Sequence, residues 1–182
     1  IQELGQTIET PYYLYSENII NKNVDEYISE LQNIDSLICY SVKANSNLSI
    51  LSLFAKKGLG FDIVSGGELQ RVIKAGGDMS KIVFSGVGKT DEEIEFALKK
   101  NIYCFNVESQ GELNRIQTIA SSLDVRANIS LRVNPEIDAK THPYITTGLS
   151  ENKFGISQND VLNSFKIISN FDSLNICGID YH

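Results

Sequence analysis

The chain has 182 residues, which is long enough for one domain with a sizeable hydrophobic core. It carries 16 basic and 23 acidic residues, a net charge of -7, which argues against nucleic acid or an anionic membrane surface as its main partner. No apolar run approaches the length of a membrane span and no segment resembles a secretory signal, so we expect a cytoplasmic protein.

In chain order, the first predicted element is an aromatic strand at residues 10–15, entered through Pro11. Ser16 then caps a predicted helix that runs to about Gln32. Beyond this helix, short runs of β-branched and aromatic residues alternate with helical patterns. The predicted strands are 38–43, 61–65, 81–86, 103–108, 128–134 and 177–182, and the predicted helices between them are 47–58, 66–75, 90–100, 109–123 and 159–169.

Four successive strand ends fall near residues 43, 64, 85 and 107, a repeat of about twenty-one residues. This alternation predicts parallel βα units, in either a doubly wound sheet or an eight-stranded barrel. The segment around Gly86 and Gly88 lacks the spacing of a dinucleotide or phosphate loop, which favours the barrel. We therefore expect an α/β fold of the (β/α)8 TIM-barrel type, represented by about six βα units. Such a fragment leaves an open parallel edge, so we expect the protein to continue beyond residue 182.

The three cysteines, Cys39, Cys104 and Cys177, each lie in a predicted strand. Their spacing fits neither a disulfide framework nor a metal motif. We interpret them as small buried apolar residues of a protein from a reducing compartment. The two histidines likewise lack metal-ligand spacing, and no metal site is expected.

Polar side chains stand at the end of each of these later strands, where βα barrels place their active sites. They are Lys43, Asp62, Ser65, Ser85, Asn106, Glu108, Arg132, Asn134 and His182. Lys43 ends an apolar run and must either extend into solvent or find a partner. Arg132 lies within an apolar strand and needs an acidic or phosphate partner, with a structural ion pair as one alternative. Polar residues after strands are also ordinary helix caps.

Three glutamates have the spacing of a capping box, in which the side chain bonds the start of its own helix. Glu68, Glu93 and Glu112 each stand three residues after a serine or threonine. Their positions alone predict a structural role at a helix N-terminus for all three.

Several stretches resemble the fold-type III pyridoxal phosphate-dependent decarboxylases. The sequence YSVKAN at 40–45 resembles the motif of the lysine that holds the cofactor, with Ser41 in place of alanine. The sequence FDIVSGGE at 61–68 resembles the family's Phe-Asp-x-x-Ser-x-x-Glu segment. In the long connection at 138–155, THPYITTG followed by KFG resembles the signature of the diaminopimelate decarboxylase branch.

The resemblance implies that Lys43 holds pyridoxal 5'-phosphate covalently, helped by burial that leaves its amine neutral. It implies that Asp62 and the catalytic residue Glu68 stand near the cofactor and its lysine. Arg132 would lie beside the pyridine ring and His182 would stack on it. Lys43, Asp62, Arg132 and His182 are thus the expected cofactor-binding residues, and Lys43 and Glu68 the expected catalytic ones.

The resemblance also implies the reaction, which is decarboxylation of meso-2,6-diaminopimelate to L-lysine and carbon dioxide by a homodimer of the full-length protein. The remaining barrel strands and a C-terminal β domain would lie outside this chain, which we expect to be inactive alone. The alternatives are an ornithine, arginine or carboxynorspermidine type of decarboxylase, an amino-acid racemase, or a non-catalytic cofactor-binding or regulatory protein of the same fold. Residues that would separate these alternatives are expected in the C-terminal part.

Overall fold

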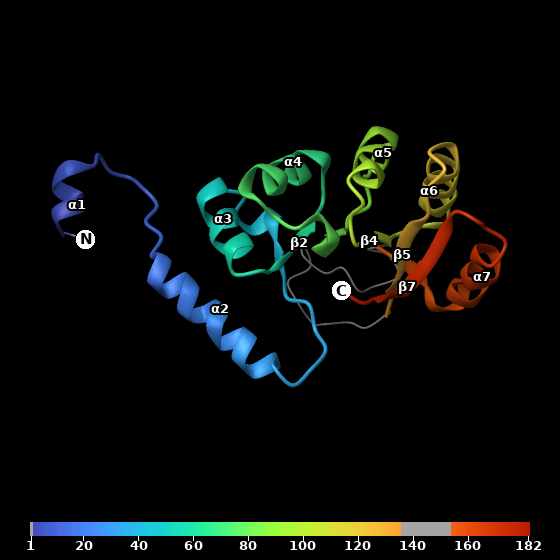
Figure 1. The fold of residues 1–182 in the computed structure, drawn as a ribbon, viewed down its shortest axis with the longest axis horizontal. Coiled ribbons are helices and arrows are strands. Elements are labelled where there is room, and N and C mark those ends of the chain that lie inside the picture. Colours follow the sequence, from blue (N-terminus) through green and yellow to red (C-terminus); the bar gives the residue numbers. More distant parts are fainter. Residues whose placement is uncertain (1, 136–153) are drawn as a thin grey trace. The chain divides into compact units, whose positions relative to one another are not determined.

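The structure is a computed structural model that describes residues 2–135 and 154–182. The chain divides into two compact units, Ile1–Ser36 and Leu37–His182 (Figure 1). Among the described residues, no helix combines the length and the apolar character needed to cross a membrane.

The first unit contains two helices, α1 (Gln2–Thr7) and α2 (Glu17–Leu31). Ser16 caps α2 as predicted, since its hydroxyl accepts a hydrogen bond from the backbone N–H of Ile19 at 3.4 Å. The predicted strand at 10–15 is wrong, because none of the described strands pairs with this segment and Tyr13 is 92% exposed. A strand is stable only when a neighbour satisfies its backbone groups, which aromatic composition alone does not supply.

The second unit is built on a parallel sheet in the order β1-β2-β3-β4-β5, with both β6 and β7 paired to β5. Every strand pair is parallel, as the alternation of strands and helices predicts. The strands are β1 (Cys39–Ser41), β2 (Gly60–Ile63), β3 (Ile82–Phe84), β4 (Cys104–Val107), β5 (Ala127–Asn134), β6 (Ile156–Ser157) and β7 (Leu174–Asp180). The short strand β6 has no counterpart in the sequence-based assignment.

A helix links each pair of consecutive strands from β1 to β5 and also links β6 to β7, and these helices follow one another along the outer side of the sheet (Figure 1). They are α3 (Leu48–Lys56), α4 (Gly66–Ala75), α5 (Asp91–Lys99), α6 (Gln110–Ser122) and α7 (Gln158–Ile168), with short 3-10 turns η1 (Val42–Ala44) and η2 (Met79–Lys81). The architecture is therefore α/β, with the βα units of a TIM-type barrel, and the barrel is not closed within this chain.

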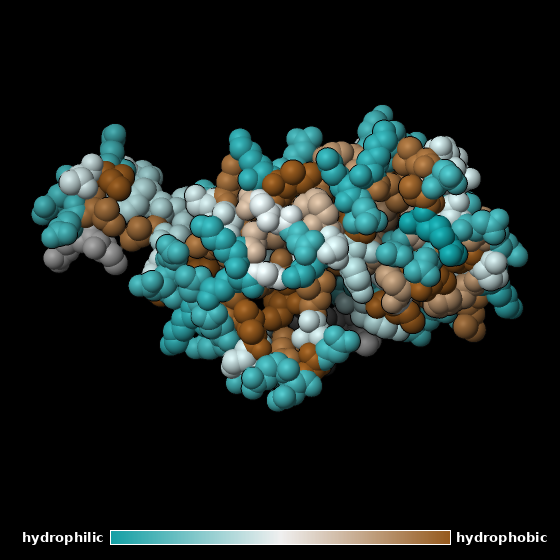
Figure 2. All heavy atoms as spheres, viewed as in Figure 1, coloured by the Kyte–Doolittle hydropathy of each residue, from teal (hydrophilic) through white to brown (hydrophobic). Residues whose placement is uncertain are grey.

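Side chains of alternate strand residues point to opposite faces of this sheet. Phe61, Phe84 and Phe105 are almost completely buried toward the helices, and the rings of Phe84 and Phe105 stack with centroids 5.9 Å apart. The opposite face, here called the inner face, carries Asp62 and Asn106 at intervening positions. On the view in Figure 2, hydrophilic side chains predominate on the surface and hydrophobic ones gather in smaller patches. The hydrophobic core thus lies between sheet and helices, which leaves the inner face for polar residues.

The expected burial of Cys39, the first residue of β1, and of Cys177 is wrong for this chain. The residues of β1 are half-buried rather than buried, because β1 stands at the sheet edge and pairs only with β2 among the described strands. Cys177 is exposed, since β5 is the one described strand that pairs with β7. Cys104, on a central strand, is buried as expected. Burial in a sheet requires neighbours on both sides, which the edge strands of this chain lack.

Serine or threonine caps the helices that follow β2, β3, β4 and β6, as each hydroxyl accepts the backbone N–H three residues further along the chain. The caps are Ser65, Thr90, Ser109 and Ser157. At α5 the full capping box is present, because Glu93 also accepts the N–H of Thr90 at 2.9 Å.

We expect Thr90→Ala to lower the free energy of unfolding by about 1 kcal/mol, because the N–H of Glu93 loses its acceptor. Urea unfolding of the variant and of the unchanged protein measures this difference. Thr90→Ser keeps the hydroxyl and is expected to change the free energy by only a few tenths of a kcal/mol. Equal stability of Thr90→Ala and Thr90→Ser would contradict the assigned cap.

Candidate functional site

A pocket of about 430 Å3 lies at the carboxyl ends of the parallel strands, within the range of roughly 300–1,000 Å3 found for small-molecule sites. Four of the five predicted site residues line it, namely Lys43, Asp62, Arg132 and His182. They come from β1 and its following turn, β2, β5 and the segment after β7. The parallel sheet therefore gathers side chains that are far apart in the sequence.

Lys43 lies in the short turn η1 directly after β1 and is exposed. The strand is positioned by Tyr40, whose ring packs on Phe54 of α3 with centroids 4.2 Å apart and whose hydroxyl donates to the carbonyl of Asn45 at 3.2 Å. Among the described residues, no hydrogen bond or ion pair engages the Lys43 amine. The expected burial of this amine is wrong for the chain as it stands, because the edge position of β1 leaves Lys43 open to solvent. Its role as the cofactor lysine stays a prediction.

Asp62 occupies the inner face of β2, and two serine hydroxyls orient its carboxylate. Ser41 donates to Oδ2 at 3.2 Å and Ser85 to Oδ1 at 2.5 Å. The chain of hydrogen bonds continues from Asn106 to Ser85 at 3.0 Å, and from Ser130 to Asn106. A polar ladder therefore crosses the inner face from β1 to β5 and fixes the carboxylate at the pocket wall.

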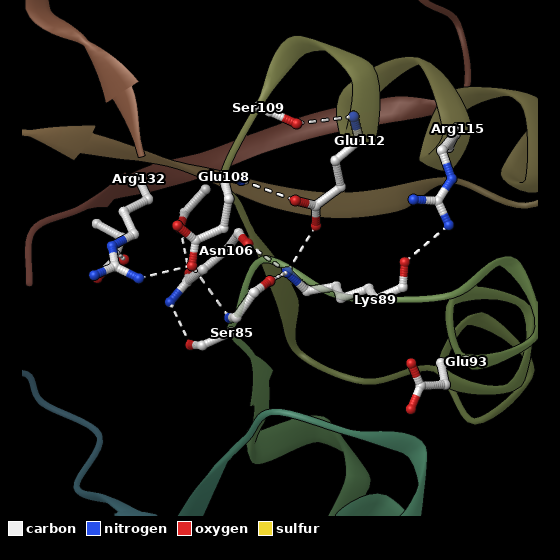
Figure 3. A network of polar contacts seen from close by, with 12 residues as sticks. Ser85, Lys89, Glu93, Asn106, Glu108, Ser109, Glu112, Arg115 and Arg132 are labelled. Carbon is white, nitrogen blue, oxygen red and sulfur yellow. Dashed lines mark hydrogen bonds and ion pairs between the residues drawn. The ribbon is translucent and has the colours of Figure 1, made fainter. Parts of the chain in front are cut away.

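Arg132 has the acidic partners that its place in an apolar strand requires. Its Nη1 lies 2.7 Å from Oε1 of Glu108 (Figure 3), and its Nε lies 3.8 Å from Oδ2 of Asp180. The centre of its guanidinium lies 5.5 Å from the centroid of the Phe154 ring, a cation–π contact. The structure confirms the ion pair that the sequence left as one alternative, and it places this ion pair at the pocket wall.

Phe154 and Gly155 belong to the KFG motif, and the rest of the connection at 138–155 lies outside the described residues. Gly155 has a φ of +85°, and a Cβ at this position would stand 2.9 Å from the carbonyl oxygen of Arg132. Only glycine fits such a close approach to β5 at a positive φ. This glycine lets the chain place Phe154 over the Arg132 side chain.

The sequence reasoning missed Asp180, although a signal for it exists. Asp180 stands two residues before His182, and it pairs in register with Arg132 on β5. Burial raises the pKa of its carboxyl, Arg132 and His182 oppose this rise, and Glu108 and Asp62 add to it. The period-two alternation of a strand could have assigned Asp180 to the inner face beside Arg132.

Glu68 does not line the pocket. Its carboxylate accepts the backbone N–H of Val64 at 2.7 Å, and its own N–H is bonded to the hydroxyl of Ser65.

The other two glutamates make similar contacts. Glu112 accepts the backbone N–H of Glu108 at 3.0 Å, and Glu93 accepts the N–H groups of Thr90 and Gly66. The structure confirms a contact at a helix N-terminus for all three glutamates, but only Glu93 forms the predicted capping box, because Glu68 and Glu112 bond the N–H of the residue before the N-cap. A catalytic role for Glu68 stays a prediction.

Lys89 is the second residue that the sequence reasoning missed. Its amine is completely buried and donates to Glu112 Oε1 at 2.7 Å, to the carbonyl of Gly86 at 2.7 Å and to the carbonyl of Asn106 at 2.9 Å (Figure 3). No sequence pattern marks it, because a lysine between a glycine and a helix cap is typical of a solvated loop.

The three cysteines differ in acidity. A hydrogen bond from Cys104 lowers the pKa of Cys177 to about 7. The same bond, together with burial, raises the pKa of Cys104, and burial together with the charge of Asp62 raises that of Cys39 to about 11. Thiolate, the reactive form, therefore accumulates first at Cys177.

Iodoacetamide is expected to modify Cys177 of this 182-residue chain first, at a rate that rises as the pH passes through about 7, because the fraction of thiolate rises with pH. Mass spectrometry of peptides from a pH series measures the three rates. Cys177→Ser is the control and should abolish the fast phase. Modification of Cys39 or Cys104 as fast as that of Cys177 would contradict this order.

The fold and the pocket together define a protein of the α/β-barrel class, whose active sites lie at the carboxyl ends of the strands. Its pocket contains the amine of Lys43, the imidazole of His182 and the guanidinium of Arg132. The family model for "Pyridoxal-dependent decarboxylase, pyridoxal binding domain" matches residues 17–182. The chain belongs to this family, which confirms the resemblance seen in its motifs.

Relatives of this chain agree with the family assignment. The diaminopimelate decarboxylase of Neisseria meningitidis is 51% identical over 179 residues, which cover 98% of this chain and 44% of the relative. The crystal structure of diaminopimelate decarboxylase from Helicobacter pylori complexed with L-lysine matches with a TM-score of 0.96 and 52% identity, over 100% of this chain and 46% of that one. The chain thus spans less than half the length of these relatives.

A more distant structure extends the comparison of the fold. The arginine decarboxylase of Paramecium bursaria Chlorella virus matches with a TM-score of 0.83 at 23% identity, over 100% of this chain and 46% of that one. At this identity the likeness shows the fold alone. The fold is therefore shared with this distant protein, and the fold alone does not decide the substrate.

Proposed function

We propose that this chain is the cofactor-binding barrel part of a pyridoxal phosphate-dependent enzyme that converts meso-2,6-diaminopimelate to L-lysine and carbon dioxide. One observation carries the proposal: Lys43, Asp62, Arg132 and His182 line a single pocket at the catalytic edge of the barrel. Identity of about 50% to diaminopimelate decarboxylases supports this choice of substrate.

The side chains of the pocket fit pyridoxal phosphate. The exposed amine of Lys43 can form the covalent link to an aldehyde, and the imidazole of His182 offers a flat surface for a ring. Arg132 supplies a cation whose position is fixed by two carboxylates. When bound, the cofactor supplies an electron sink for the charge that remains when an amino acid loses its carboxylate.

The residues of this pocket would bind the cofactor, orient it and keep water away from it. Asp62 is held by Ser41 and Ser85, so that its carboxylate faces the same pocket as Lys43 in a fixed orientation. A fixed acceptor in the same pocket as the Lys43 amine could hold a proton at its carboxylate oxygen. Phe154 packs over the Arg132 guanidinium, and the low exposure of the Arg132 and Glu108 side chains strengthens the electrostatic effect of their ion pair.

We propose further that the protein acts as a homodimer in the cytoplasm and that a longer polypeptide supplies the missing barrel strands and a C-terminal domain. The greater length of the relatives and the unclosed sheet support the longer polypeptide. The net charge of -7 supports a small-molecule partner rather than nucleic acid or an anionic membrane. Three free cysteines within the described residues support a reducing compartment.

The experiment that tests this function mixes the full-length protein and pyridoxal phosphate with meso-diaminopimelate, ornithine or arginine, and measures released carbon dioxide and product. We expect L-lysine from meso-diaminopimelate and little turnover of the other two amino acids. Faster turnover of ornithine or arginine would assign another decarboxylase, and inversion without loss of carbon dioxide would assign a racemase. Cofactor binding without any reaction would assign a regulatory protein.

A further inference from the structure

Glu108 stands directly after β4 and is 5% exposed. Its Oε1 accepts hydrogen bonds from Nη1 of Arg132 at 2.7 Å and from the backbone N–H of Gly86 at 3.2 Å (Figure 3). Its Oε2 is buried and has no hydrogen-bond partner among the described residues. A buried carboxylate oxygen without a donor costs free energy, so stability alone does not account for a glutamate at this position.

A network of buried hydrogen bonds and one ion pair, formed by Glu112 and Lys89, holds the backbone around Glu108. Glu112 accepts the backbone N–H of Glu108 with Oε2 and pairs with Lys89 through Oε1 (Figure 3). Lys89 also donates to the carbonyl of Gly86, whose N–H bonds the Glu108 carboxylate, and to the carbonyl of Asn106 in β4. One buried cation thus ties together the segments after β3 and β4. This network holds the backbone of Glu108, and the backbone N–H of Gly86 holds Oε1 of its carboxylate.

Of the two acidic partners of Arg132, Glu108 is the stronger. The distance to Glu108 is 2.7 Å, against 3.8 Å to Asp180, and the Glu108 side chain is 2% exposed, against 23% for Asp180. A short contact in a buried environment interacts more strongly than a longer one that solvent screens. The place of the guanidinium is therefore set mainly by Glu108.

We propose that Glu108 is a positioning residue of the cofactor site, which holds the Arg132 guanidinium at the pocket wall where it can interact with the bound cofactor. Glu112 and Lys89 in turn hold the backbone around Glu108. This inference rests on the proposed cofactor-binding function and deepens it. Glu108 acts through Arg132, and the buried ion pair serves orientation, because such pairs contribute little net stability compared with apolar residues.

The test compares full-length proteins that carry Glu108→Gln, Arg132→Met or both changes with the unchanged protein. Titration with pyridoxal phosphate, followed by absorption and fluorescence, gives the affinity and the spectrum of the bound cofactor. We expect Glu108→Gln to weaken the affinity roughly tenfold, as for loss of one charged hydrogen bond, and to alter the pH dependence of the absorption band. In the Arg132→Met background, the same change is expected to weaken the affinity less than about twofold, because the residue through which Glu108 acts is gone.

Two controls separate positioning from folding. Glu95→Gln removes a carboxylate of the exposed pair with Lys99 on α5 and should leave affinity and spectrum unchanged. Glu93→Gln weakens a helix-cap contact outside the pocket and should lower the unfolding midpoint without changing the spectrum of the bound cofactor. If Glu108→Gln does not fold, Glu108→Asp replaces it in the test. Aspartate keeps the charge, but its side chain is one methylene shorter, so its carboxylate lies further from Arg132 and the same loss of affinity is expected.

Unchanged affinity and spectrum in Glu108→Gln, or in Glu108→Asp if that variant is used, would overturn the inference while leaving the proposed function standing. Equal losses with and without Arg132 would also overturn it, since Glu108 would then act independently. If the unchanged full-length protein formed no cofactor band, the proposed function would fail, and the inference with it.

Discussion

Replacing Lys43 with alanine in the full-length protein is expected to remove the visible absorption band of bound pyridoxal phosphate and to lower turnover of meso-diaminopimelate by at least about a thousandfold. The reason is chemical, because alanine has no amine with which to link the cofactor. Lys43 is the lysine that lines the pocket, and no described residue engages its amine. Absorption spectra with added cofactor and a carbon dioxide assay measure both effects.

Lys56→Ala is the matched control for this experiment. Lys56 is an exposed lysine in the last turn of α3, the helix that follows Lys43, and it does not line the pocket. We expect its removal to leave both band and turnover unchanged. A Lys43→Ala protein with the spectrum and the rate of the unchanged protein would show that the cofactor is held elsewhere.

The substitution Lys89→Met is expected to lower the free energy of unfolding by about 3 to 5 kcal/mol, the range seen when one partner of a buried ion pair is removed. Methionine keeps the length and apolar body of the side chain but leaves the Glu112 carboxylate and the carbonyls of Gly86 and Asn106 without their donor. Chemical unfolding of the full-length protein, followed by circular dichroism, measures the loss.

The exposed pair of Lys99 with Glu95 supplies the comparison. Lys99→Met is expected to change the free energy of unfolding by about 0.5 kcal/mol or less, because solvent screens an exposed ion pair. A Lys89→Met protein as stable as Lys99→Met would show that the buried network contributes little. The double substitution Lys89→Met with Glu112→Leu should recover part of the loss, since an apolar pair replaces an unpaired buried charge.

The parallel βα architecture could be predicted from the sequence because its elements repeat at a regular distance and begin with strong caps. Ser65, Thr90 and Ser109 act as the spacing predicts, and the central strands lie within a few residues of their expected bounds. The segment at 10–15 shows the limit of this reasoning. Aromatic composition favours a strand there, but a strand also needs a neighbour, and pairing is not a local property.

The candidate site could be predicted in part, because barrels collect the ends of parallel strands at one edge. Four of the five predicted residues line the same pocket. Glu68 is not among them, because its carboxylate turns back to the N–H of Val64. Capping and catalytic glutamates share the same spacing, so the sequence could not distinguish the two roles.

Local patterns and motifs in the sequence predict the repeating units, the helix caps, the family and most of the residues at the carboxyl edge of the sheet. Which charged groups are buried, and with which partners they pair, follows from the packing of the folded chain. Lys43, which ends an apolar strand, is exposed, whereas Lys89, in a polar loop, is completely buried against Glu112. The pairing of Arg132 with Glu108 was likewise open until β4 and β5 lay side by side. Burial and charge pairing depend on neighbours distant in the chain, and these exist only after the sheet has formed.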